Sequence, residues 1–131
     1  MTAIESTVQA RVLLIDDDDL IAGSLRQYLA RQGCDVDVAV EHSAATMLMR
    51  SNRYGVVVVD PYLTGAVHME NSDMLDDIVL LQPSASVIVV TGYGSPELTR
   101  LASDARLSLL PKPQSVVVLS ELIFGALRAE A

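Results

Sequence analysis

Residues 11–19 read RVLLIDDDD, and this stretch decides the fold class. Residues 12–15 form an uninterrupted run of branched apolar side chains, which is typical of a strand covered on both faces of a sheet. The run stops abruptly at Asp16, and three more aspartates follow it. Such a strand needs helices above and below it, so we expect an α/β protein with carboxylates at the end of one buried strand.

The rest of the chain alternates short apolar runs with stretches of helical period. The predicted strands are residues 12–15, 34–40, 56–59, 87–90 and 107–110. The predicted helices are residues 20–29 with a stop at Gly33, residues 43–52, residues 72–81, a helix that begins at Ser95-Pro96, and a helix from Ser115 to Leu127. This alternation predicts a parallel sheet built from five strand–helix units.

The chain has 131 residues, which fits one domain, and its 9 basic and 17 acidic side chains give a net charge of -8. A chain of this charge repels phosphate backbones and anionic membranes, so neither nucleic acid nor a membrane is expected as a direct partner. The sequence contains no apolar stretch of about 20 residues and no signal peptide, so we expect a cytoplasmic protein. We interpret residues 1–10 as a loose leader, residues 11–128 as the domain and residues 129–131 as a tail.

Polar side chains follow the predicted strands, at the edge where ligands bind in open α/β sheets. These residues are Asp16, Asp17, Asp60, Thr91 and Lys112. If the first and third strands are neighbours, three carboxylates come within about 5 Å, at a cost of about 3 kcal/mol per ionised pair for an effective dielectric of about 20. A raised carboxyl pKa, the lysine ammonium or a hard divalent cation would offset this repulsion.

Magnesium fits this group of side chains best, because it binds through one or two carboxylates and keeps several waters and phosphoryl oxygens. A carboxylate beside such an ion, with a lysine and a hydroxyl facing it, is arranged to receive a phosphoryl group. Asp60 would then act as the nucleophile, while the metal ion and the ammonium neutralise the developing charge.

Four motifs in this order resemble a bacterial response-regulator receiver domain, the phosphorylated module of two-component systems. They are LLIDDD at residues 13–18, VVVD at residues 57–60 followed by Thr64-Gly65, IVVTG at residues 88–92, and PKP at residues 111–113. The resemblance covers residues 11–127. It implies a flavodoxin-like, doubly wound sheet of five parallel strands in the order 2-1-3-4-5, with five helices.

The resemblance also implies roles for the polar residues. Asp60 would be the phosphoacceptor, Asp17 the direct ligand of Mg²⁺ and Asp16 its partner, while the backbone carbonyl of Tyr62 completes the protein ligands. A sensor histidine kinase or a phosphotransfer protein would supply the phosphoryl group, and a downstream effector domain or protein would receive the signal.

Thr91 and Lys112 would respond to the bound phosphoryl group. By the resemblance, Thr91 is the switch hydroxyl that moves toward the group, and Lys112 binds its oxygens. The domain would be a signalling module and not an enzyme in the usual sense.

Several positions depart from the family pattern. Pro61, Thr64 and His68 make the loop after Asp60 unusual, and the pair at residues 105–106 is Ala-Arg. Leu109 stands where the family commonly has an aromatic residue that couples the site to the signalling face. A leucine has no ring to rotate inward, so the alternative is a degenerate receiver that acts as a phosphorylation-independent docking module.

A third reading is an enzyme. Residues 16–18 also satisfy the Asp-x-Asp pattern of haloacid-dehalogenase-like phosphatases, with Thr91 and Lys112 as their hydroxyl and lysine. That family needs a further acidic pair after the lysine, and only Glu121 and Glu130 follow, both in the predicted final helix. We rank this reading below the first two, and a flavin-binding module lower still, because the first strand ends in carboxylates where a flavin phosphate needs backbone amides.

We expect several other side chains to have structural and not functional roles. Cys34 cannot form an internal disulfide and is expected to be a small buried hydrophobe. His42 and His68 are expected at the surface or in loops, because neither has a second histidine or cysteine at metal spacing. The residues expected in the core include Met47, Met49 and Met74, and an apolar face of the final helix made of Val118, Leu119, Leu122, Ile123 and Leu127.

Overall fold

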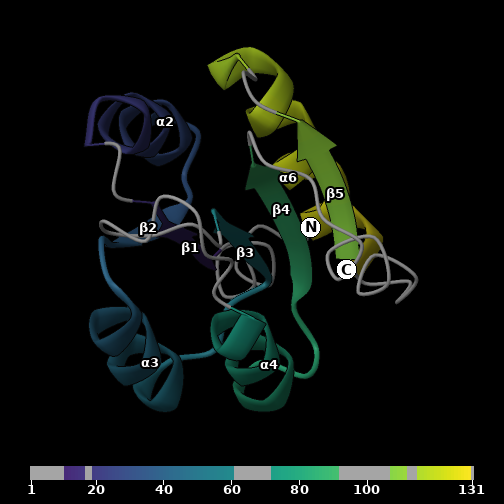
Figure 1. Cartoon of the computed structure of the whole chain (residues 1–131). Helices are drawn as coiled ribbons and strands as arrows, with labels where there is room; N and C mark the ends of the chain where they lie inside the picture. The colour runs from purple at the N-terminus through teal and green to yellow at the C-terminus, as the bar shows by residue number, and fades with distance from the viewer. Residues whose placement is uncertain (1–10, 17–18, 61–71, 92–106, 112–114, 131) are drawn as a thin grey trace.

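A computed structural model describes residues 11–16, 19–60, 72–91, 107–111 and 115–130 of the chain. Within these ranges it contains five strands and four helices (Figure 1). The strands are β1 (Arg11–Ile15), β2 (Asp35–Ala39), β3 (Val56–Val59), β4 (Ser86–Thr91) and β5 (Leu107–Pro111). The helices are α2 (Asp19–Arg31), α3 (His42–Ser51), α4 (Ser72–Leu81) and α6 (Val116–Glu130).

The five strands form one parallel sheet in the order β2-β1-β3-β4-β5. This order confirms the predicted flavodoxin-like, doubly wound fold. All five strands and four of the helices begin and end within about three residues of their predicted bounds, the usual error of boundary prediction. The fifth predicted helix, which begins at Ser95-Pro96, lies outside the described residues.

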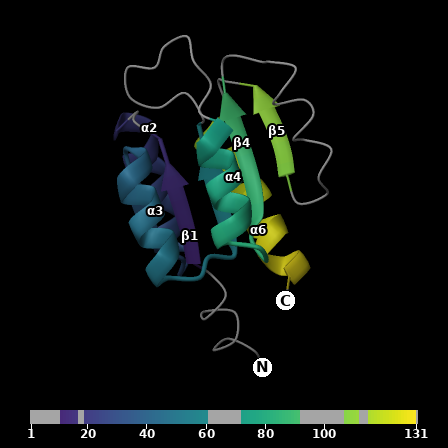
Figure 2. The ribbon, with the colours of Figure 1, turned by 60° about the horizontal axis from the view of Figure 1, so that its bottom comes forward.

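Helices cover both faces of the sheet, as a run of buried branched residues requires. Figures 1 and 2 show α3 and α4 on one face and α2 and α6 on the other. Alternate residues of a strand point to opposite faces, so each strand contributes to two cores. Leu13, Val57 and Val87 pack with the α3 and α4 side chains, and Val12, Val56 and Ile88 pack with those of α2 and α6.

The predicted core residue Met47 lies instead at the surface, with 70% of its side chain exposed. Ala45 and Met49 form the buried stripe of α3, and Met49 is only 2% exposed, as predicted. Met47 is two residues from each of them, which places it about 200° around the helix and away from the sheet. The prediction was wrong because it followed residue type and not the phase of the helix. The side chain of Met74 lies outside the described residues.

The apolar face of α6 is narrower than predicted. Leu119 and Ile123 are buried against the sheet, but Val118 is 44% exposed and Leu122 is 39% exposed. Leu127 is partly buried against the same core. Because α6 carries apolar residues on nearly all sides, the sequence pattern does not indicate which of them face the sheet.

The turn between α2 and β2 has the geometry that the sequence predicts. Gly33 has a φ of +93°, a left-handed conformation that costs glycine little. The amide of Cys34 donates to the Leu29 carbonyl, and the amide of Gly33 donates to the Ala30 carbonyl, which closes the end of the helix. Cys34 is buried, as predicted, and burial raises the pKa of its thiol.

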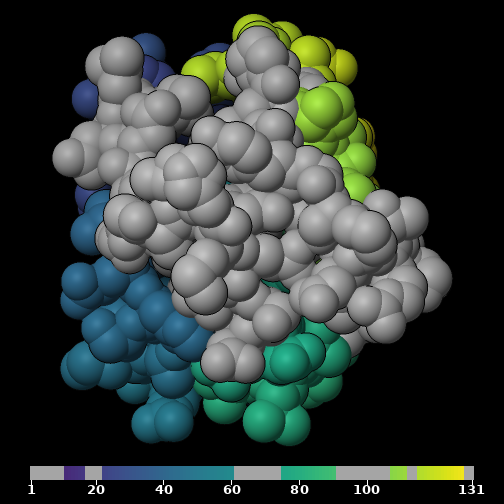
Figure 3. All heavy atoms as spheres, in the orientation of Figure 1, coloured from purple at the N-terminus to yellow at the C-terminus, as the bar shows by residue number. Residues whose placement is uncertain are grey.

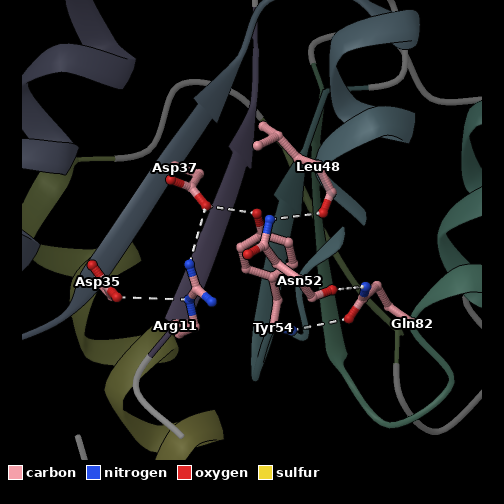
Figure 4. Close-up of polar contacts among 7 residues, drawn as sticks. All are labelled: Arg11, Asp35, Asp37, Leu48, Asn52, Tyr54 and Gln82. Carbon is pink, nitrogen blue, oxygen red and sulfur yellow. Dashed lines mark hydrogen bonds and ion pairs between the residues drawn. The ribbon is translucent and has the colours of Figure 1, made fainter. Parts of the chain in front are cut away.

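A buried glutamine joins three elements at the amino end of the sheet (Figure 4). Gln82 follows α4 directly, and its Nε2 donates to the carbonyl oxygens of Met49 at 2.8 Å and Asn52 at 2.7 Å. Its Oε1 accepts from the backbone amide of Tyr54 at 2.9 Å. The end of α3, the start of β3 and the end of α4 are therefore held by one side chain.

Tyr54 extends this network to the edge strand. Its hydroxyl donates to Oδ2 of Asp37 at 2.6 Å, and the same carboxylate lies 3.8 Å from a guanidinium nitrogen of Arg11. The Arg11 guanidinium also lies 5.8 Å from the centre of the Tyr54 ring and 3.7 Å from Oδ2 of Asp35. Burial and the hydrogen bond to Asp37 raise the pKa of Tyr54 well above its usual range.

We predict that two methionines on the same helix respond very differently to truncation. Met49→Ala should lower the free energy of unfolding by about 2–5 kcal/mol, because it leaves a cavity in the core. Met47→Ala should change it by about 0.5 kcal/mol or less, because the side chain is in solvent. Urea denaturation of both variants measures this difference, and equal losses would contradict the assigned phase of α3.

We predict that the Tyr54 hydroxyl stabilises the folded protein and that this contribution is lost at alkaline pH. The pKa of Tyr54 is higher in the folded state than in the unfolded chain, where it is about 10. The contribution is therefore complete below about pH 10 and is lost as the pH rises further. Tyr54→Phe should cost about 1 kcal/mol at neutral pH, and its difference from the wild type should shrink above about pH 10. Urea titrations that show a constant or growing difference would refute this account.

Candidate functional site

Two of the predicted site carboxylates lie at the carboxyl edge of the sheet, on neighbouring strands. β1 and β3 pair in parallel with Ile15 opposite Val59, so Asp16 and Asp60 occupy the next position on each strand. The Asp60 amide donates to the Ile15 carbonyl at 2.9 Å, and the Asp16 amide donates to the Ala39 carbonyl at 3.1 Å. These hydrogen bonds at the ends of β2, β1 and β3 therefore fix the backbone positions of both aspartates.

The two carboxylates differ in burial. Asp60 is only 8% exposed, although it is an acidic residue, whereas Asp16 is half-buried. Acidic residues are rarely this buried unless they are paired or bind a cation, because leaving water disfavours the charged form. The structure thus places one buried and one more accessible aspartate at adjacent positions on the neighbouring central strands.

The backbone of Thr91 lies at the same edge, on the next strand. Val59 pairs with Val89, so β4 continues two residues past the end of β3 and finishes at Thr91. Thr91 in turn pairs with Pro111, the last residue of β5. Lys112 comes directly after Pro111 in the sequence, but it lies outside the described residues.

The described residues thus bring together three of the predicted site positions: Asp16, Asp60 and the backbone of Thr91. Asp17 and Tyr62 lie outside the described residues, as does Lys112. Pro61, Thr64 and His68, which depart from the family pattern, lie outside them as well.

The donors in the described part of the site suit magnesium. Within the described ranges no group of three or more His, Cys, Asp or Glu side chains could hold a metal ion. Mg²⁺ commonly binds through one or two carboxylates and fills the rest of its octahedron with water. Asp16 and Asp60 are carboxylates at the edge where such an ion would bind.

One polar contact near this edge has no counterpart in the sequence analysis. Nε2 of His42 lies 2.7 Å from Oδ2 of Asp77, and this contact joins α3 to α4. His42 is the first residue of α3, and its side chain is 33% exposed, so it lies partly at the surface, as expected. The two residues are 35 positions apart, so no local pattern in the sequence could have found the pair.

None of the helices in the described part of the chain is long and apolar enough to cross a membrane. Comparison with known proteins gives a direct match to one family: the model of the response regulator receiver domain matches residues 12–124. This match covers most of the chain, including Asp16, Asp60 and all five strands except Arg11, the first residue of β1.

Three relatives illustrate the match. A cyclic di-GMP phosphodiesterase of Thermotoga maritima is 31% identical over 118 residues, which are 89% of this chain and 31% of the relative. A CheY-like receiver domain protein of Methanospirillum hungatei has a TM-score of 0.80 and 27% identity, covering 93% of this chain and 96% of that one. A response regulator of Burkholderia pseudomallei has a TM-score of 0.72 and 29% identity, covering 91% of this chain and 66% of that one.

The curated relatives are longer than this chain. It spans 31% of the length of the first, and 52% and 46% of the next two. The similarity therefore concerns one domain of those proteins.

We predict that Mg²⁺ stabilises the protein through these carboxylates. At a concentration of about 100 times its dissociation constant, a ligand of the folded state adds about 2.7 kcal/mol, which raises the midpoint of thermal unfolding. The rise should be much smaller in the Asp16→Asn/Asp60→Asn variant and unchanged in Asp76→Asn, which removes an exposed carboxylate of α4. An equal rise in all three proteins would show that the ion acts elsewhere.

Proposed function

Since the chain belongs to the response regulator receiver domain family, we propose that Asp60 accepts a phosphoryl group from a histidine kinase or a phosphotransfer protein, with Mg²⁺ as cofactor. The phosphorylated domain then relays the signal to a downstream effector domain or protein. The observation that carries this proposal is the position of Asp60, a buried acidic residue at the end of the central strand β3 and beside Asp16.

In the proposed reaction a carboxylate oxygen of Asp60 attacks the phosphorus of a phosphohistidine. The new O–P bond forms as the P–N bond breaks, and the departing imidazole nitrogen keeps the electron pair and takes a proton from solvent. Burial limits the access of water to Asp60 and strengthens the electrostatic interactions around it.

The neighbouring residues have proposed roles in the same reaction. Asp16, Asp17 and Asp60, with the backbone carbonyl of Tyr62, would hold the Mg²⁺ ion. When bound, the ion supplies positive charge against the phosphoryl oxygens. Lys112 would bind another of these oxygens, and the Thr91 hydroxyl would hydrogen-bond to the group and convey its presence to the rest of the domain.

The relatives support this proposal. The Burkholderia pseudomallei structure is that of a response regulator with a phosphorylated aspartic acid and a calcium ion. A phosphorylated aspartic acid and a divalent cation in one protein of this kind are in keeping with the acidic edge of this sheet. The acidic net charge of this chain does not suggest an anionic membrane or nucleic acid as a direct partner, and we propose that it acts in the cytoplasm.

The domain proposed to carry out this function runs over residues 11–128, and the family match at residues 12–124 lies inside it. Some relatives carry enzyme names, but this chain covers only a minor part of their length. Receiver domains are signalling domains, and we propose that this one has no catalytic activity beyond its own phosphorylation and slow dephosphorylation.

A second candidate function remains open because of Leu109. This residue lies in the middle of β5, pairs with Val89 and packs, partly buried, against the core on the α3 and α4 side. A leucine in this position fills space but offers no ring that could change orientation on phosphorylation. The alternative proposal is a degenerate receiver that docks to its partner without being phosphorylated.

We predict that a small-molecule phosphodonor labels Asp60. Incubation of the protein with acetyl phosphate and Mg²⁺ should add the mass of one phosphoryl group, and Asp60→Asn should abolish the addition. Asp76→Asn serves as the matched control and should be labelled like the wild type. Unlabelled wild-type protein, shown to be folded by circular dichroism, would contradict the proposal.

We predict that beryllofluoride with Mg²⁺ distinguishes the two candidates. If the domain switches, amide chemical shifts should change at the carboxyl edge and also along β5, around Leu109. Shift changes confined to residues near Asp16 and Asp60 would mean that the site is occupied without transmission. No change at any residue would favour the phosphorylation-independent docking module.

A further inference from the structure

A pocket of about 580 Å³ lies at the amino end of the sheet, at the opposite edge from Asp60. The ends of α3 and α4 and the start of β3 surround it, and we call it the amino-edge pocket. Its lining residues are Met49, Arg50, Ser51, Asn52, Arg53, Tyr54, Gly55, Leu81, Gln82, Pro83 and Ser84. Five of them are exposed, so the pocket opens widely to solvent.

The charge of the pocket is opposite to that of the chain. The protein carries a net charge of -8, yet the described lining residues include two arginines, Arg50 and Arg53, and no carboxylate. Both arginine side chains are exposed and reach solvent at the pocket. The nearby acidic residues Asp35 and Asp37 are engaged with Arg11 on the edge strands. The pocket is therefore locally positive and favours a negatively charged ligand.

Hydrogen bonds compensate part of the negative partial charge at the end of α3, which lies beside the pocket. The last carbonyls of a helix carry partial negative charge and repel anions. Here the Leu48 carbonyl accepts from the amide and from Nδ2 of Asn52, at 3.0 and 3.1 Å. The Met49 carbonyl accepts from Gln82. Hydrogen bonds thus occupy these carbonyls before any ligand arrives.

The floor of the pocket is held rigid by the same network. Gln82 is 4% exposed and binds the backbones of Met49, Asn52 and Tyr54, and Tyr54 is itself tied to Asp37. A pocket that keeps its shape in the free protein loses little conformational entropy when it binds a ligand. This observation favours a binding surface over a gap between loosely packed helices.

Exposed apolar side chains lie on the two helices whose ends line the pocket. Met47 on α3 is 70% exposed and Leu80 on α4 is 75% exposed, the two highest values among the large apolar residues of the described chain. Both helices run side by side (Figures 2 and 3). Residues at the carboxyl ends of both helices line the pocket. Exposed apolar groups beside a charged pocket are typical of a protein interaction site.

We propose that the amino-edge pocket docks an acidic segment of a partner protein. Carboxylates of the segment pair with Arg50 and Arg53, and its apolar side chains pack on Met47 and Leu80. A nucleic acid or an anionic membrane presents many phosphates and would meet the repulsion of the whole acidic chain, whereas a short peptide meets mainly the local arginines.

The proposed docking does not depend on phosphorylation. β3 joins Gly55 in the pocket to Asp60 at the opposite edge, and five residues of strand span about 16 Å. A segment bound at one edge leaves the other edge accessible to a phosphodonor. The failure of one proposal therefore leaves the other intact.

The experiment uses a ten-residue peptide of alternating Glu and Leu, titrated into ¹⁵N-labelled full-length protein. We expect saturable amide shift changes at residues 49–55 and 81–84. The Arg50→Glu/Arg53→Glu variant should bind at least about tenfold more weakly. The matched control, Arg26→Glu/Arg31→Glu, makes the same change in net charge at exposed positions of α2 on the other face and should bind within about twofold of the wild type.

Several outcomes would overturn the proposal. Equal weakening in both double variants would mean that only the net charge matters. Equal binding of a peptide with Gln in place of Glu would exclude the arginines as the recognition element. The same shifts with inorganic phosphate at equal concentration would identify a small-anion site, and the absence of saturable shifts would exclude docking. Thermal unfolding of each variant verifies that it is folded, as expected for exposed arginines.

Discussion

The Asp60 amide donates a hydrogen bond to the Ile15 carbonyl, and the pairing of β1 with β3 that includes this bond positions the candidate site. A shift by one residue would turn every side chain of the strand to the other face. Leu13 and Val57 would then leave one core and enter the other. The packing of the two cores therefore fixes the register, and the register places Asp16 beside Asp60. The site is a consequence of how the strands fill their two faces.

The two ends of this sheet are built differently. At the carboxyl end, β1 and β3 finish in carboxylates, one of them buried, which is a costly arrangement unless cations or donors compensate for it. At the amino end, Gln82 and Tyr54 use their polar atoms to bind backbone groups and a carboxylate that also lies near Arg11. The interactions at the amino end stabilise the sheet, so the carboxyl end can accommodate carboxylates that repel one another.

The candidate site was more predictable from the sequence than most of the surface. Asp16 and Asp60 follow uninterrupted apolar runs, and in a parallel sheet such ends meet at one edge whatever the details of packing. No comparable rule predicts the contact of His42 with Asp77. The same is true of the pocket lined by Arg50 and Arg53. They depend on how α3 and α4 lie against each other. No periodicity within either helix contains that information.

The sequence by itself determined the α/β class, the five strands and the edge at which the acidic residues gather, because strand burial leaves a strong local pattern of apolar runs. The strand order came from resemblance to a family and was then found in the sheet. Only the tertiary structure decided that Met47 and Leu122 face solvent while Met49 and Ile123 are buried. These helices carry more apolar residues than the sheet can cover, so their rotation is set by contacts between segments far apart in the chain.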